Sequence, residues 1–453
     1  MIFKRKIYES LLKWKSTANG KWAVLIEGAR RIGKSTIAEQ FAKEQYKSYL
    51  LINFSIAPNE VKEVFRNNLE NLDVLFMFLQ TYYHVNLQER DSLIIFDEVQ
   101  AFPRAREAIK FLVADGRYDY LETGSLISIK QNVKDIVIPS EEMTMNMYPL
   151  DFEEFCEAMG NTQIIKYIHY CFEKQQPLER GIHNQAMLLF KQYMLTGGMP
   201  ESVSAFIDSK LSFTQCDTTK RLILNLYLND IQKIKDSDKG KVAAIFDSIP
   251  SSLSRHDREV VFSNIIPGST YMQFDETFYY LKSSMMCNLC FNVTDPSVAL
   301  SLNEDRASVK CYLSDTGLLI SQAFNEKSEL AHEVYKQILF DKLKFNNGMF
   351  YENAIAQMLV ATGHKLFFYK HYNKELHRND MEIDFIITDA NSLKYKICPI
   401  EVKSTTRYQI NSLKKFVDKY HERISKAYII HPANFKIKDG ITYIPSYMTI
   451  CLM

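Results

Sequence analysis

Short apolar runs alternate with amphipathic stretches over the first 150 residues. The runs lie at residues 23–26, 49–53, 93–96 and 118–122. Apolar runs of this length between helical segments are typical of strands in a parallel α/β sheet. We expect the first three runs to be buried on both faces, because helices cover both sides of such a sheet. The pattern therefore predicts an α/β domain over residues 1–150.

Beyond residue 150 the apolar spacing becomes helical. The residues that form apolar helix faces are Phe152, Phe155, Tyr167, Leu188, Phe190 and Tyr193. Spacings of three, four and seven residues place such side chains on one side of a helix. We therefore expect a helical lid over residues 151–230.

A third region follows, whose pattern predicts three short helical segments. The first covers residues 242–249, the pattern breaks at Pro250, and it resumes through Val260, Tyr271 and Phe278. Three short helices with a turn between the first two predict a winged-helix-like module over residues 231–325. A charged linker then leads into a final α/β region over residues 326–453, which mixes one helix with strands.

Composition narrows the class of protein. A chain of 453 residues is too long for one core, and a net charge of +1 with 46% hydrophobic residues fits a globular protein without a global charge bias. Any nucleic-acid contact must then be a local patch. Eight scattered cysteines and the absence of an apolar leader predict a cytoplasmic protein with free thiols. No apolar run approaches the roughly 20 residues needed to cross a membrane.

Cys287 and Cys290 have the inner spacing of half a zinc site. No second Cys or His pair follows at a suitable interval, and a structural zinc site needs four ligands. We therefore expect two packed core thiols.

Residues 28–35 read Gly-Ala-Arg-Arg-Ile-Gly-Lys-Ser, which matches the phosphate-binding loop GxxxxGK[ST] in full. The glycines allow backbone N–H groups to wrap phosphates, Lys34 neutralises the β and γ oxygens, and Ser35 ligates magnesium. The expected cofactors are ATP and Mg²⁺. The expected nucleotide-binding residues are Gly28, Ala29, Arg30, Arg31, Ile32, Gly33, Lys34, Ser35 and Thr36, with Asp97 and Ser125 from later strand ends.

Two carboxylates follow the third apolar run. We expect Asp97 to hold magnesium through water and Glu98 to orient the attacking water, so that Glu98 and Lys34 are the catalytic residues. The next run ends in Thr123-Gly124-Ser125. A small hydroxyl there could touch the γ-phosphate or the attacking water, although a plain strand-to-loop turn explains these residues equally well.

Six segments in family order give the chain a resemblance to a known family. They lie at residues 28–35, 95–100, 122–126, 148–155, 196–201 and 312–319, and two of them, Tyr-Pro-Leu-Asp-Phe-Glu-Glu-Phe and Thr-Gly-Gly-Met-Pro-Glu, are fairly specific. The chain resembles the prokaryotic AAA-type ATPases that carry a C-terminal domain of unknown function. Many relatives have an arginine before the Tyr-Pro-Leu segment, where it could serve as a finger on the γ-phosphate. Residues 139–148 here contain none, which leaves Arg104, Arg106 and Arg117 as candidates.

The C-terminal region carries its own carboxylates in an ordered series. Glu352 begins an apolar helix, Asp384 lies on a strand, and Glu401 and Lys403 share one face of the next strand because the side-chain period is two. The order resembles the core of PD-(D/E)XK nucleases. That resemblance implies that Glu352, Asp384 and Glu401 ring magnesium while Lys403 assists catalysis. Glu382 shares a strand face with Asp384 and is a rival ligand, and an ordinary amphipathic strand would also give Glu-x-Lys.

Two functions remain open at this point. In the first, ATP hydrolysis drives a nuclease-like domain that contacts DNA or another nucleic acid, through basic residues at 370–374, 377–379 or 255–258. In the second, ATP switches a protein-interaction adaptor whose C-terminal domain is catalytically dead. A homo-oligomer is a further candidate state, and no membrane partner is expected.

Overall fold

The computed structural model describes residues 2–124, 140–234, 236–324, 328–340, 342, 347–373, 375, 377–389 and 396–452. The chain divides into two compact units, Met1–Tyr148 and Pro149–Met453. The second unit contains the regions predicted as a helical lid, a winged-helix-like module and a C-terminal domain. In the described residues no helix combines the length and the apolar character needed to cross a membrane.

A parallel sheet of five strands organises the N-terminal unit, which confirms the predicted fold class. Its spatial order is β2-β3-β4-β1-β5. The strands are β1 (Ala23–Glu27), β2 (Ser48–Asn53), β3 (Ser92–Asp97), β4 (Asp119–Gly124) and β5 (Glu142–Asn146). The order places the end of β4 between the phosphate-binding loop after β1 and the carboxylates that end β3.

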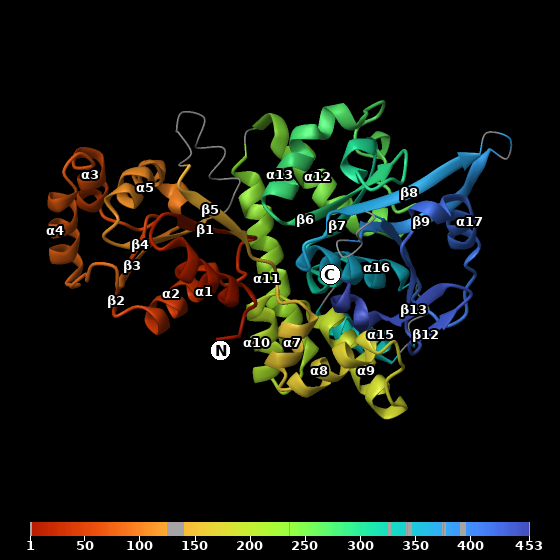
Figure 1. Ribbon diagram of the computed structural model, residues 1–453. Coiled ribbons are helices and arrows are strands. Elements are labelled where there is room, and N and C mark those ends of the chain that lie inside the picture. The colour runs from red at the N-terminus through yellow and green to blue at the C-terminus, as the bar shows by residue number, and fades with distance from the viewer. Residues whose placement is uncertain are drawn as a thin grey trace. The chain divides into compact units, whose positions relative to one another are not determined.

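Helices cover both faces of this sheet (Figure 1). One face carries α1 (Ile7–Ala18) and α2 (Lys34–Gln45), and the other carries α3 (Asn59–Asn67), α4 (Leu72–Tyr83) and α5 (Pro103–Asp115). A short turn, η1 (Val99–Ala101), links β3 to α5. The core beneath α3 and α5 is aromatic, with Phe54 within 5.6 Å, between ring centroids, of the rings of Phe65, Phe96 and Phe102. This packing holds the strand ends that form the site.

The expectation that three strands would be buried on both faces is right for β1 and β3 and wrong for β2. Every residue of β1 and β3 is buried, whereas only Leu50 and Ile52 are buried in β2. The reason is position, since β2 is an edge strand of the sheet.

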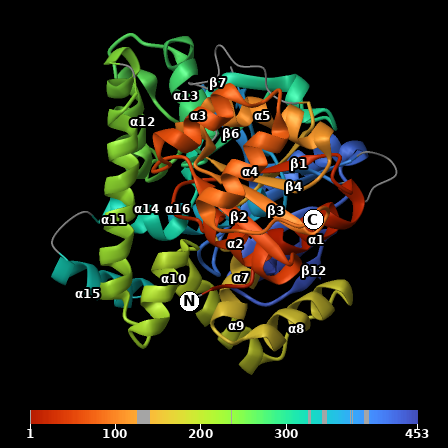
Figure 2. The ribbon, with the colours of Figure 1, turned by 90° about the vertical axis from the view of Figure 1, so that its left-hand side faces the viewer.

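The second unit begins with a helical region. Its helices are α7 (Phe152–Ala158), α8 (Thr162–Glu173), α9 (Arg180–Thr196), α10 (Pro200–Asp208) and α11 (Phe213–Gln232). Figure 2 shows α11 and the following α12 (Asp236–Leu253) along one side of this unit.

The predicted helix break at Pro250 does not occur, because this proline lies inside α12. A proline cannot donate to the carbonyl four residues earlier. Here that carbonyl, of Phe246, accepts a hydrogen bond of 2.9 Å from the Gln322 side chain. Tertiary contact therefore replaces the bond that proline removes.

A mixed sheet of eight strands fills the rest of the unit, in the order β12-β13-β11-β10-β9-β8-β6-β7. The strands are β6 (Cys287–Val293), β7 (Glu304–Leu313), β8 (Leu366–Asn373), β9 (Arg378–Thr388), β10 (Ile397–Val402), β11 (Ala427–His431), β12 (Lys436–Lys438) and β13 (Ile441–Pro445). The remaining α-helices are α13 (Asp275–Ser283), α14 (Thr316–Ala323), α15 (Ser328–Leu339), α16 (Gly348–Ala361) and α17 (Asn411–Tyr420). Short 3₁₀ turns are η2 (Phe262–Asn264), η3 (Tyr271–Phe274), η4 (Leu300–Asn303), η5 (His421–Arg423) and η6 (Ser446–Cys451).

The β6–β7 hairpin belongs to the region predicted as a winged-helix-like module, yet β6 pairs in parallel with β8 of the C-terminal region. Cys287 and Cys290 on β6 are buried free thiols, as expected.

Two of the family-like segments meet at a packing junction. The carboxylate of Asp315 accepts hydrogen bonds from the backbone N–H of Gly198, at 2.5 Å, and of Leu318, at 2.9 Å. A Cβ on Gly317 would lie 2.5 Å from the carbonyl oxygen of Thr196, so glycine is required for the close approach. These segments therefore join α9 to α14 and form part of the scaffold.

Candidate nucleotide site and C-terminal carboxylate cluster

The loop between β1 and α2 curls around the Lys34 ammonium. Lys34 Nζ donates to the carbonyl oxygens of Gly28 and Ala29, at 3.0 and 2.9 Å. Gly33 has a left-handed backbone, with φ of 91°, at the start of α2. A Cβ on Gly28 would lie 2.5 Å from the Met147 carbonyl oxygen, so a side chain has no room there. The motif glycines thus have the conformational role that the sequence predicts.

Arg5 fastens this loop from the N-terminal segment. Its side chain is buried and donates to the carbonyl oxygens of Ile32, at 2.9 Å, and of Tyr148, at 2.5 Å. No pattern in the sequence predicts this role for Arg5. A basic side chain at the start of a chain resembles any solvated arginine, so only its distant partners reveal its role.

Asp97 is the centre of a polar cluster at the carboxyl edge of the sheet. Its Oδ1 accepts hydrogen bonds from the Ser35 hydroxyl, at 2.5 Å, and from the Thr123 hydroxyl. Its Oδ2 accepts a bond of 2.7 Å from the Asn53 amide. The sequence-based prediction did not include Asn53 among the site residues. Asn53 ends β2 at the same sheet edge, and a polar residue directly after an apolar run could have indicated its role. Ser125, predicted to bind the nucleotide, lies outside the described residues.

The electrostatics of Lys34 link the loop to both carboxylates. Burial of its ammonium lowers the pKa of Lys34 to about 8, while the charges of Glu98 and Asp97 act in the opposite direction. Glu98 itself has a left-handed backbone, with φ of 52°, and its carboxylate accepts a hydrogen bond from the Gln100 amide. Of the two acids, Asp97 contacts the loop directly, through the Ser35 hydroxyl.

These residues fit a magnesium nucleotide. Ser35 and Asp97 place a hydroxyl and a carboxylate oxygen together beside the loop, and hard oxygen ligands are those that magnesium prefers. The loop offers the start of α2 and the Lys34 ammonium to phosphates.

The three arginine-finger candidates are already engaged within the N-terminal unit. Arg106 is buried and paired with Glu142 at 2.7 Å. Arg104 pairs with Glu107, and Arg117 with Asp115 and Asp73. Burial and the neighbouring Glu142 raise the pKa of Glu122, the residue before Thr123, well above its usual range. Arg106 is therefore a counter-ion for the buried carboxyl groups of Glu142 and Glu122.

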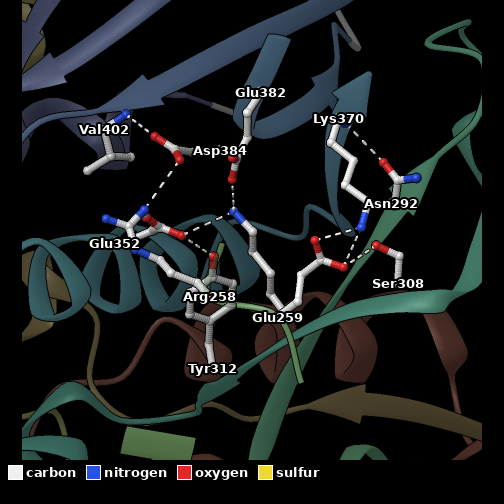
Figure 3. A network of polar contacts seen from close by, with 11 residues as sticks. Arg258, Glu259, Asn292, Ser308, Tyr312, Glu352, Lys370, Glu382, Asp384 and Val402 are labelled. Atoms are coloured by element: carbon white, nitrogen blue, oxygen red, sulfur yellow. Dashed lines mark hydrogen bonds and ion pairs between the residues drawn. The ribbon is translucent and has the colours of Figure 1, made fainter. Parts of the chain in front are cut away.

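The C-terminal carboxylates also come together, but around cations of the chain itself (Figure 3). Glu352, fully buried on α16, accepts from the Tyr312 hydroxyl and pairs with Arg258. Arg258 Nη1 also lies 3.4 Å from Asp384 Oδ1. Lys310 Nζ, likewise buried, lies 3.7 Å from Glu352 Oε1 and 3.2 Å from Glu382 Oε1.

The expected ring of three metal ligands is not formed in this arrangement. Arg258 contacts both Glu352 and Asp384, and the described residues contain no group of three His, Cys, Asp or Glu side chains arranged to hold a metal ion. The physical reason is that internal cations occupy the carboxylate oxygens. Glu382, the rival ligand, is likewise paired with Lys310.

Glu401 and Lys403 point to the same side, as their spacing implies, and their charged groups are 2.5 Å apart. Burial raises the pKa of Glu401 to about 7, against the opposing effect of Lys403. Lys403 therefore serves first as the counter-ion of Glu401.

The basic residues proposed as nucleic-acid contacts are also partly neutralised. Lys370 lies 2.6 Å from Glu259, His371 lies 2.7 Å from Asp380, and Arg258 is bound by the acids. Lys374 and the side chain of Arg378 lie outside the described residues.

The loop, the order of the strands and the Asp97 cluster define the N-terminal unit as a P-loop nucleotide-binding domain. Residues 21–156 match the model of a family described as an AAA domain, so this unit is similar to AAA domains. Residues 187–329 and 347–448 match two further families, each described as a domain of unknown function. No curated protein matches the chain.

Solved structures with partial likeness include AAA-type proteins. A katanin self-assembly structure is 13% identical, over 35% of this chain and 55% of that chain, with a TM-score of 0.22. A signal-transduction ATPase with a tetratricopeptide repeat sensor from Pyrococcus horikoshii is 14% identical, over 79% and 48%, with a TM-score of 0.27. AMPPCP-bound DnaA from Aquifex aeolicus is 11% identical, over 76% and 96%, with a TM-score of 0.23. The chain spans about half the length of the katanin and signal-transduction ATPase chains. Structural similarities with TM-scores this low add nothing to the family match.

Proposed function

We propose that the N-terminal unit hydrolyses ATP. The observation that carries the proposal is the pair of acids at the end of β3, where Asp97 accepts a hydrogen bond from the hydroxyl of the P-loop residue Ser35 and Glu98 follows directly. A nucleotide-binding domain without turnover would need the loop and its lysine, but not a second acid directly after the magnesium carboxylate.

The residues divide the work of phosphoryl transfer. Lys34 and the loop amides bind and orient the phosphates, and Ser35 with Asp97 would hold magnesium, which supplies positive charge to the phosphate oxygens. Glu98 accepts a proton from, or orients, the attacking water. Thr123 and Asn53 fix the Asp97 carboxylate through both of its oxygens.

Glu98→Gln tests the hydrolysis proposal. Turnover should fall about 100-fold or more, because an amide can contact water but cannot accept its proton as a carboxylate does. ATP affinity, measured by titration, should stay within about twofold, since a group that acts only in the transition state contributes little to ground-state binding. Glu107→Gln, on α5, is the matched control and should change neither quantity. If Asp97→Asn were the only harmful change, Glu98 would not be the catalytic acid and the roles would need reassigning.

For the C-terminal region we propose a nuclease-like core that engages a partner without cutting it. The order α16, β8, β9, β10, α17, β11 supports the nuclease-like reading, as does the approach of Glu352 and Asp384 to one shared arginine, Arg258. The pairing of Glu352 with Arg258 and Lys310 favours a non-cleaving core over an active nuclease.

The partner class is tested by ATP turnover with and without DNA, in magnesium and in manganese. Stimulation without strand cleavage is the expected result for a nucleic-acid partner. Unchanged turnover would favour the protein-interaction adaptor, and metal-dependent cleavage would overturn the non-cleaving proposal.

A further inference from the structure

One thiol of the second unit lies beside an imidazole ring that is itself bound to a carboxylate. The sulfur of Cys451 is 3.6 Å from His169 Nδ1, a hydrogen-bonding distance for sulfur. On the other side of the ring, His169 Nε2 is hydrogen-bonded to the carboxylate of Glu153. A nucleophile, a base in contact with it and a third group that orients the base are the parts of an activated nucleophile.

The three residues come from three elements that pack against one another. Glu153 is in the first turn of α7, His169 is on α8, and Cys451 ends η6. A capping box fixes the start of α7, because the Asp151 carboxylate accepts a hydrogen bond of 2.9 Å from the Glu154 N–H. Glu153 therefore projects from a well-defined helical turn toward the ring.

The chain around Cys451 is anchored, so its thiol has a defined position. The next residue, Leu452, is buried, and its carbonyl oxygen accepts a hydrogen bond of 2.9 Å from His364 Nε2. Tyr447, at the start of the same turn, is also buried, and its hydroxyl lies 2.9 Å from His183 Nδ1. These contacts on both sides of Cys451 hold the thiol next to His169.

The partners of His169 decide which ring nitrogen can take a proton from the thiol. Because a carboxylate only accepts hydrogen bonds, the proton of the neutral ring lies on Nε2, toward Glu153. Nδ1 is then the basic nitrogen, and it faces the Cys451 sulfur. Transfer of the thiol proton to Nδ1 gives a thiolate, the nucleophilic form of cysteine, beside an imidazolium that Glu153 stabilises.

Accessibility separates Cys451 from the other thiols of the chain. The seven other cysteines are buried, whereas Cys451 is partly exposed. The side chain of His169 is 29% exposed and that of Glu153 is 13% exposed. A small molecule in solution can therefore reach this thiol and its base together, while the buried thiols are protected.

We propose that Cys451 is a modification site at which His169 activates the thiol for exchange with a low-molecular-weight disulfide of the glutathione class. The thiolate sulfur attacks one sulfur of the disulfide, and the new S–S bond forms as the old one breaks. The other half leaves as a thiolate and takes the proton held on His169 Nδ1. The products are a mixed disulfide on Cys451 and one small-molecule thiol, so Cys451 is oxidised and the small disulfide is reduced. The exchange requires a thiolate and access to it, which these three residues supply.

The test measures how fast oxidised glutathione modifies the full chain at pH 7, followed by intact mass spectrometry with peptide mapping. The parent should gain one glutathione, on Cys451, and Cys451→Ser should gain none. His169→Gln should react about tenfold more slowly, because an unassisted cysteine is only a few per cent thiolate at that pH. His421→Gln, which changes an exposed histidine on η5, is the matched control and should react like the parent.

The pH profile separates activation from a merely structural role for His169. The rate for His169→Gln should rise about tenfold per pH unit between pH 6 and 8, as an ordinary thiol ionises, and the rate for the parent should rise much less. Equal rates and equal profiles in the two proteins would overturn the proposal, and so would modification of a buried cysteine in place of Cys451. Should His169→Gln not fold, the parent profile decides alone, because a tenfold rise per pH unit in the parent, as in an unstructured cysteine peptide, would equally overturn it.

Discussion

Asp97 and Glu352 are both buried acids, yet their partners differ in kind. The side chains that donate hydrogen bonds to Asp97, those of Ser35, Thr123 and Asn53, are neutral. Glu352 is surrounded by Arg258 and Lys310, with the Tyr312 hydroxyl. An acid held by neutral donors keeps its full negative charge for a ligand cation. An acid held by arginine and lysine has already been neutralised.

The comparison shows that the function of a buried acid depends more on the charge of its neighbours than on the residue type alone. Both sites have carboxylates at strand ends or on an adjoining helix, and both match a known order of residues. Only the neighbours distinguish the proposed site for a metal nucleotide from a cluster whose acids are paired with cations of the chain.

The largest effect that would sharpen this comparison is expected from Glu352→Gln. The change removes the anion that pairs with Arg258 and one of the two acids that face the buried Lys310, which should cost about 3 kcal/mol of stability. The chain's two tryptophans, Trp14 and Trp22, both lie in the N-terminal unit. In a denaturant titration, circular dichroism should therefore shift to lower denaturant while tryptophan fluorescence does not.

Asp295→Asn is the control for that experiment, because its pair with Arg423 is about half exposed and such pairs contribute at most about 1 kcal/mol. An unchanged dichroism transition in Glu352→Gln would mean that the cations do not depend on Glu352, and the contrast between the two acids would fail.

Lys34→Ala should weaken ATP binding about 100-fold, since charge-assisted hydrogen bonds to phosphate contribute about 1.5–3 kcal/mol. Isothermal titration with a slowly hydrolysed ATP analogue measures this directly. Lys403→Ala removes a lysine of the C-terminal carboxylate cluster and should leave ATP affinity as it is. Equal losses in the two variants would contradict the division between the proposed nucleotide site and the ion-paired cluster.

The smallest effect concerns pH. Because burial lowers the pKa of the nucleotide-free Lys34 to about 8, the ammonium that phosphates require is present below that pH and lost above it. ATP affinity should be flat up to about pH 8 and about tenfold weaker at pH 9. Titrations in two buffers of different ionisation enthalpy should reveal proton uptake on binding near pH 8. Binding that stays constant to pH 9 would place the lysine outside the phosphate cradle.

Much of the N-terminal unit could be predicted from the sequence, because each of its signals is local. A loop motif between an apolar run and a helix fixes Gly28 to Ser35, and the run before Asp97 fixes β3. The exposed edge strand β5 was missed since its residues are largely polar and partly exposed. Asn53 and Arg5 were missed because their partners are distant in sequence.

The C-terminal site shows the opposite limit. The order of residues in the sequence identified Glu352, Asp384 and Glu401 as candidates. It could not identify Arg258, which lies 94 residues before Glu352 and is linked to it by no spacing rule. The same limit explains Pro250, which breaks a helix by local rules and is accommodated by Gln322 from another helix. Interactions of this kind are decided by tertiary packing.

The parallel pairing of β6 with β8 also bears on how this chain can be cut or recombined. A fragment that begins after residue 325 would keep β8 but lose β6 and β7, so that an interior strand would become a bare edge. Bare edges recruit strands from other molecules and promote aggregation. The two C-terminal family matches, although separate along the sequence, should therefore be inherited and expressed as one block.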